Sequence, residues 1–138
     1  MSFQQLAESY LKQAKRRLKN AEEALREGEY PYAVRQCQEC VELSLKAALR
    51  FVGVDYPKIH DVSVVLIKVT QKFPEWFNEK IEFFSEVSKS LVEKRALAMY
   101  GLEVEGLTPE KMFDSLSAKD ALNKSRTILE YCEKLIKP

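Results

Sequence analysis

The chain has 138 residues, of which 46% are hydrophobic and 31% are charged, and its formal net charge is +1. This length suits a single domain over residues 1–138, and the composition excludes a disordered chain. The near-neutral balance gives no overall electrostatic footprint for nucleic acid or anionic membranes. No segment approaches the ~18 consecutive apolar residues of a membrane span, so we expect no membrane association.

The first half of the chain predicts two long helices. Apolar spacing predicts a first helix over Ser2–Arg26, ended by Gly28. Its basic run, Lys12–Lys19, is typical of a solvated helix face, with phosphate binding as the alternative. A second helix over Tyr30–Val52 is apolar on two sides, which predicts a central helix enclosed by neighbours. The short turn between the two helices makes them antiparallel neighbours.

The second half predicts three further helices. A third covers Val62–Lys72, although its β-branched residues also suit a strand, and no partner strand is predicted elsewhere. A fourth runs from Glu75 or Asn78 to Ala98, and a last one opens at Ser117 with a capping-box-like start. Leu102–Leu116 is irregular, with one short helical turn at Thr108-Pro109-Glu110. The sequence therefore predicts an all-α, antiparallel up-and-down bundle of about five helices.

The three cysteines are Cys37, Cys40 and Cys132. Their odd number gives no disulfide framework, and no signal peptide precedes them, so we expect a cytoplasmic protein with reduced thiols. Cys37-Gln-Glu-Cys40 has metal-ligand spacing, but a tetrahedral site would need both Cys132 and His60 as well. Small core residues in the middle of a helix are the favoured interpretation, and we expect neither a metal nor a cofactor.

Two polar features interrupt this helical pattern. In His60-Asp61, the carboxylate can orient the imidazole, or one of the two residues simply caps the third helix. Arg95 falls on the apolar stripe of the fourth helix, where an inward guanidinium must meet a carboxylate, a carbonyl or a ligand. It extends to the bundle end, pairs with Glu39 or Glu42, or contacts an anion such as phosphate. Trp76-Phe77 is interpreted as core packing or as a dimer contact.

The order of several motifs resembles the HEPN domain, whose name stands for "higher eukaryotes and prokaryotes nucleotide-binding". They follow a long amphipathic first helix and extend over nearly the whole chain. The motifs are Gly28-Glu29-Tyr30-x-x-Ala33, Cys40-Val41-Glu42-x-x-x-Lys46-Ala47-x-Leu49, His60-Asp61 and Arg95-x-x-Ala98-x-Tyr100-Gly101.

The resemblance implies a helical homodimer, often partnered by a minimal nucleotidyltransferase in a toxin–antitoxin pair. Several HEPN toxins are metal-independent ribonucleases that use an Arg-x4–6-His motif. Here Tyr100 stands where that motif has histidine, and a phenol with a pKa near 10 is a poor acid–base group at neutral pH. We therefore expect a non-enzymatic protein that binds a nucleotide or a nucleotidyltransferase, with Arg95, Tyr100, His60 and Asp61 as ligand-binding residues. The alternatives are a ribonuclease toxin that uses Arg95 with Tyr100 or His60, and a purely structural partner subunit.

Overall fold

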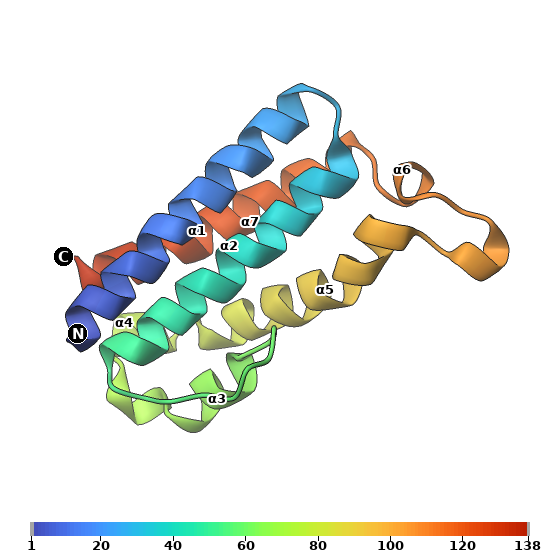
Figure 1. Ribbon diagram of the computed structural model, residues 1–138. Helices are drawn as coiled ribbons and strands as arrows, with labels where there is room; N and C mark the ends of the chain where they lie inside the picture. Colours follow the sequence, from blue (N-terminus) through green and yellow to red (C-terminus); the bar gives the residue numbers. More distant parts are fainter. Residues whose placement is uncertain (1, 138) are drawn as a thin grey trace.

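The computed structural model describes residues 2–137, and it confirms the all-α antiparallel bundle. The four long helices are α1 (Phe3–Arg26), α2 (Tyr30–Phe51), α5 (Ile81–Tyr100) and α7 (Ser115–Ile136). The short elements are α3 (Ser63–Lys68), η1 (Thr70–Lys72), α4 (Glu75–Asn78), η2 (Glu103–Glu105) and α6 (Pro109–Met112). Helices α1 and α5 run in one direction and α2 and α7 in the other, so the long helices alternate up and down (Figure 1). No helix within residues 2–137 is long and apolar enough to span a membrane.

Helix α2 is the central helix, as its two apolar sides predict. It packs against α1, α5 and α7, and its side chains Cys37, Leu45 and Leu49 are fully buried. Such burial is the main favourable term in folding, at about 1.5–3 kcal/mol for each large apolar side chain. Helix α5 packs mainly against α2 and α3 and only lightly against α7. This leaves α2 to connect the packed α1–α7 side of the bundle with α5.

The middle of the chain refines two predicted elements. The valine-rich segment is helical rather than a strand, but α3 ends at Lys68 and a 3-10 turn, η1, completes the predicted span. Phe77 is fully buried, and Trp76 packs edge-on against it and stacks on Tyr131 of α7. Within this chain, then, Trp76 and Phe77 are packing residues.

The predicted start of the last helix at Ser117 is wrong, because the helix begins earlier in the chain. Helix α7 begins at Ser115, and its N-cap is Asp114, whose side chain accepts a hydrogen bond from the Ser117 backbone N–H at 2.8 Å. The Ser117 hydroxyl in turn accepts from the Asp114 N–H, and hydrogen bonds from Ser117 lower the pKa of Asp114. Asp114 is the N-cap because its carboxylate is a strong hydrogen-bond acceptor at that position and its backbone is extended. Ser117 is therefore the third residue of the first turn rather than the cap.

Between α5 and α7 the chain forms an arm that contains the predicted short turn, α6, with Pro109 at its first position. Gly101 ends α5 with φ of 67°, and a Cβ at this position would lie 2.0 Å from the Leu107 carbonyl oxygen. Only glycine fits there, because Leu102 and Leu107 pair in a single antiparallel bridge directly beside it. The arm projects from the end of the bundle opposite α3 and α4 (Figure 1).

Candidate functional site

A row of polar side chains follows one face of the central helix α2. Gln38, Glu42 and Lys46 are spaced four residues apart, which places them above one another on the helix. Glu42 accepts hydrogen bonds from Gln38 Nε2 at 2.9 Å and from Lys46 Nζ at 2.7 Å. Gln38 is 1% exposed, and the Glu42 side chain is 17% exposed. The row is therefore a fixed, mostly buried arrangement rather than a solvated surface.

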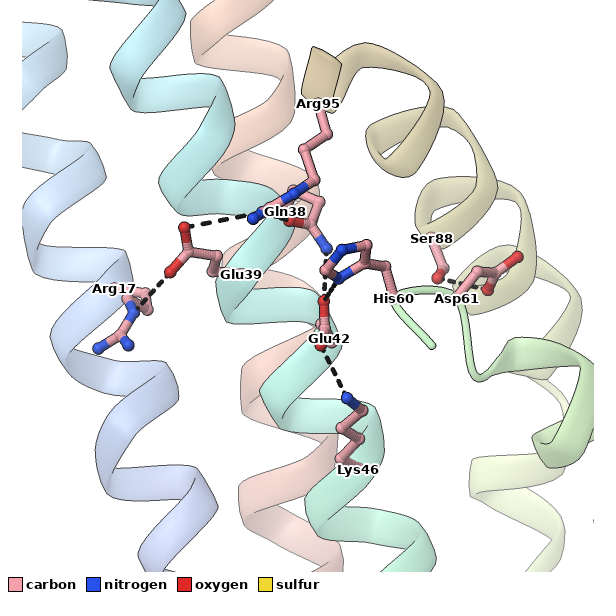
Figure 2. A network of polar contacts seen from close by, with 9 residues as sticks. All are labelled: Arg17, Gln38, Glu39, Glu42, Lys46, His60, Asp61, Ser88 and Arg95. Atoms are coloured by element: carbon pink, nitrogen blue, oxygen red, sulfur yellow. Dashed lines mark hydrogen bonds and ion pairs between the residues drawn. The ribbon is translucent and has the colours of Figure 1, made fainter. Parts of the chain in front are cut away.

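The loop between α2 and α3 brings His60 to this row. Asp61 Oδ1 accepts from the Ser63 N–H at 3.0 Å, from the Ser63 hydroxyl at 2.6 Å and from the Ser88 hydroxyl of α5 at 2.7 Å. The formal N-cap of α3 is Val62, so Asp61 stabilises the start of α3 from one residue further out. Figure 2 shows Asp61 turned toward Ser88 and His60 turned toward Glu42. Asp61 therefore anchors the loop and does not face the same space as His60.

The contact between His60 and Glu42 defines the state of the imidazole. Burial opposes the charged form of Glu42, but hydrogen bonds from Lys46, Gln38 and His60, with the Lys46 charge, outweigh it and lower the pKa of Glu42. Ionised Glu42 can only accept hydrogen bonds. Since His60 Nδ1 lies 2.9 Å from Glu42 Oε1, Nδ1 carries the hydrogen, and a neutral imidazole keeps its lone pair on Nε2. The His60 side chain is 52% exposed, so part of the ring is open to solvent.

Arg95 approaches the same row from α5. Its Nη1 donates a short hydrogen bond to Gln38 Oε1 at 2.6 Å, while the nearest carboxylate oxygen, Glu39 Oε2, is 3.8 Å away. Gln38 uses its amide nitrogen for Glu42 and its oxygen for Arg95, an orientation that a reversed amide would spoil by setting donor against donor. Of the two carboxylates predicted to pair with Arg95, only Glu39 lies within ion-pair distance, and it is far. The main partner of Arg95 is the uncharged amide of Gln38.

These side chains enclose a shallow cleft of about 200 Å³, which we call the polar cleft. It is lined by Arg17, Glu39, Glu42, Leu43, His60 and Arg95. Arg17 of α1 donates from Nε to Glu39 Oε1 at 2.9 Å (Figure 2). The arginines and carboxylates that line the cleft are equal in number, and Lys46, which pairs with Glu42 beside the cleft, adds one positive charge. An anion with a planar or tetrahedral set of oxygens suits such a cleft.

Tyr100 does not line the polar cleft. It lies five residues beyond Arg95, which places it about 140° around the helix axis, and it is 59% exposed near the arm. The structure thus brings together Arg95 and His60 among the four predicted ligand-binding residues. Tyr100 and Asp61 face elsewhere.

A second groove lies between α5 and α7 and has a volume of about 290 Å³. Its lining includes the apolar side chains Phe83, Val87 and Leu91, with Lys94 and the Lys124–Asp120 ion pair as charged groups. It holds none of the predicted site residues. The polar cleft is smaller, but it is the one that joins Arg95 and His60 to fixed hydrogen-bonding partners around one space, as a binding site for a polar ligand requires.

The cysteines lie apart from this chemistry. Cys37, Cys40 and Cys132 are fully buried, which confirms the interpretation of Cys37 and Cys40 as core residues. Burial raises the pKa of the Cys37 thiol to about 12 and raises those of Cys40 and Cys132 as well. Within residues 2–137, no cluster of three or more His, Cys, Asp or Glu side chains is placed to hold a metal ion.

Comparison with known proteins decides the family. The family model described as "HEPN domain" matches residues 7–135. The chain belongs to the HEPN domain family. Among solved structures, TT1696 from Thermus thermophilus is 23% identical in sequence, with a TM-score of 0.73. The match covers 93% of this chain and 96% of that chain. ST0689, described as an archaeal HEPN homologue, is 25% identical in sequence, with a TM-score of 0.68. The match covers 95% of this chain and 98% of that chain. The search of curated proteins found no match.

Within this HEPN chain, sequence reasoning found Arg95 and His60 but missed how they are linked. Gln38 joins Arg95 to Glu42, and Glu42 joins both to His60 and Lys46. The signal in the sequence was a polar residue at three positions spaced four apart, Gln38, Glu42 and Lys46, on a helix with a buried apolar stripe. Arg17 was noted only as part of a basic run, and nothing in that run marks it as the residue that turns toward α2.

Proposed function

We propose that this HEPN protein binds a nucleotide through its phosphate groups at the polar cleft and does not act on it. The observation that carries the proposal is the position of Arg95. Its guanidinium is fixed by the neutral Gln38, and the closest carboxylate oxygen lies at 3.8 Å, so its charge is only partly compensated. Guanidinium groups bind phosphate oxygens through paired hydrogen bonds. His60 Nε2, which is an acceptor in the neutral imidazole, can take a hydrogen bond from a hydroxyl or amino group of the nucleotide at the rim.

The test is calorimetric titration of ATP into wild type, Arg95→Ala and Lys94→Ala. Lys94 is the matched control, because it precedes Arg95 on α5 but lines the groove toward α7. We expect wild type and Lys94→Ala to bind alike and Arg95→Ala to bind at least about tenfold more weakly, as loss of a charge-assisted hydrogen bond implies. Absence of binding by wild type, or equal affinities for the two variants, would contradict the proposal.

A second candidate function, metal-independent ribonuclease activity, is favoured by the His60–Glu42 contact. Glu42 keeps the hydrogen on Nδ1, which leaves Nε2 able to accept a proton from an attacking 2′-hydroxyl beside Arg95. The hydroxyl oxygen would bond to phosphorus, the bond from phosphorus to the 5′-oxygen would break, that oxygen would take a proton from water, and His60 would return its proton to solvent. RNA cleavage in EDTA that is lost in both His60→Ala and Arg95→Ala would support this candidate, and intact RNA after prolonged incubation would exclude it.

The assembly of the protein is proposed on the family alone. We infer a homodimer that partners a minimal nucleotidyltransferase, within a toxin–antitoxin pair. Its three unpaired, buried cysteines suit the reducing conditions of the cytoplasm, where we expect it to act. Light scattering would give twice the mass of the 16.0 kDa chain for a homodimer, and a monomeric mass at micromolar concentration would contradict it.

A further inference from the structure

Two arginines from different helices converge on one carboxylate in the polar cleft. Arg17 of α1 donates to Glu39 Oε1 at 2.9 Å, and Arg95 Nη1 of α5 lies 3.8 Å from Glu39 Oε2. Figure 2 shows Glu39 on α2 between the two guanidinium groups, with one oxygen directed to each. The side chains of Arg17, Glu39 and Arg95 are 31%, 25% and 28% exposed, so solvent reaches all three.

This arrangement holds Glu39 loosely. Arg17 uses its Nε on a single oxygen rather than a bidentate pair, and Arg95 is beyond hydrogen-bond distance. Partly exposed ion pairs of this kind contribute about 0–1 kcal/mol. A phosphate group is a stronger partner than a carboxylate for two guanidinium groups, because it offers more oxygens and more charge.

We propose that Arg17 is a second phosphate-binding residue and that Glu39 is an internal competitor, whose carboxylate occupies the phosphate position until a ligand displaces it. This inference rests on the proposed nucleotide binding. It adds that Glu39 keeps the two arginines of the cleft in place in the absence of ligand. The phosphate is bound by Arg17 of α1 together with Arg95 of α5, at the position that Glu39 of α2 occupies in the free protein.

Other charges near the cleft do not fit these roles. Lys15, from the same basic run as Arg17, is held by Glu133 of α7 at 2.9 Å. Glu42 is the other carboxylate of the cleft, but it accepts hydrogen bonds from Gln38, Lys46 and His60 together. Displacing Glu42 would leave three donors unpaired, whereas displacing Glu39 exchanges one acceptor for another.

The test compares ATP affinity by calorimetry for Arg17→Ala and Glu39→Gln with two matched controls. Arg126→Ala removes an arginine that pairs with Glu22 of α1 at 3.1 Å outside the cleft, and Glu133→Gln removes a carboxylate that pairs with Lys15. The controls change the net charge by the same amount as the test variants. We expect Arg17→Ala to bind about tenfold more weakly and Glu39→Gln roughly threefold more tightly, and both controls to bind like wild type.

Circular dichroism and thermal unfolding establish that each variant is folded. Arg17→Lys, which keeps the charge and loses the planar fork, is the second variant at that position, and we expect it to bind with intermediate affinity. If Arg95→Ala lowers affinity but Arg17→Ala matches Arg126→Ala, or Glu39→Gln matches Glu133→Gln, this inference is overturned while the proposed function stands. If wild type does not bind ATP, or Arg95→Ala binds normally, both fail together.

Discussion

The two faces of α2 use one helix for opposite purposes. Its apolar stripe carries fully buried side chains such as Cys37, Leu45 and Leu49. Toward α5 and the loop before α3 it presents Gln38, Glu42 and Lys46, each with a polar partner. The first face stabilises the fold by removing apolar area from water. The second face contributes little net stability, because each hydrogen bond replaces one to water.

The contrast between the apolar stripe and the polar row shows that fold stability and ligand binding depend on different residues of α2. A charged row on a mostly buried helix is tolerated only when each group is satisfied, since an unpaired buried polar group is costly. Here the network satisfies Gln38 and Glu42 internally but leaves Arg95 and His60 with groups that can still bind. Changes on the two faces should therefore separate stability from ligand affinity.

The largest effect should follow from a change on the apolar face. Leu45→Ala, at a fully buried position, should lower the free energy of unfolding by about 2–5 kcal/mol through lost transfer energy and a cavity. Arg95→Ala should cost at most about 1 kcal/mol, because that side chain is partly exposed. Urea unfolding of both variants measures the difference, and equal costs would break the comparison.

A smaller, pH-dependent effect is expected for Glu42→Gln. The pKa of Glu42 is lowered in the folded protein, so its stabilisation is present above the ordinary value of 4.5 and is lost as the pH falls through the folded-state pKa. The variant should be less stable than wild type by ~1–2 kcal/mol at pH 7. Thermal unfolding between pH 7 and pH 3 should show the two curves converging below about pH 4.5. A constant difference across that range would show that Glu42 is not held by its charge.

The smallest effect concerns the anchor of the loop that carries His60. Ser88→Ala removes one of the hydrogen bonds accepted by Asp61 and leaves those from Ser63 in place. We expect a loss of about 0.5–1.5 kcal/mol in the free energy of unfolding. Ser90→Ala, two residues along α5, is the control, and chemical denaturation in parallel measures both. If Ser88→Ala matches that control, Asp61 does not anchor the loop through α5.

The helices could be predicted because each long one carries its own apolar period and a clear end. Gly28 and Gly53 follow α1 and α2, and both have positive φ. The start of α7 could not be fixed in the same way, because Asp114 and Ser117 are both good caps within one turn. Periodicity places a helix and its faces, but the hydrogen bonds of its first turn decide the first residue.

The candidate site was predictable only where a residue broke a helical pattern. Arg95 stood out because it interrupts an apolar stripe, and Glu39 and Glu42 were its candidate partners on α2. The contact of His60 with Glu42 depends on the path of the loop after Gly53, which has no repeating pattern to read. Arg17 was hidden for the opposite reason, because a basic residue on a basic helix face gives no signal until its partner is known.

The central claim is that a nucleotide binds in the polar cleft, and the single histidine of the chain gives it one direct test. NMR signals of the His60 ring, assigned without ambiguity, can be followed while ATP is added. The account predicts that these signals shift and saturate with ATP in wild type and move far less in Arg95→Ala. ATP binding that leaves the His60 ring unchanged, or no saturable change at all, would contradict it.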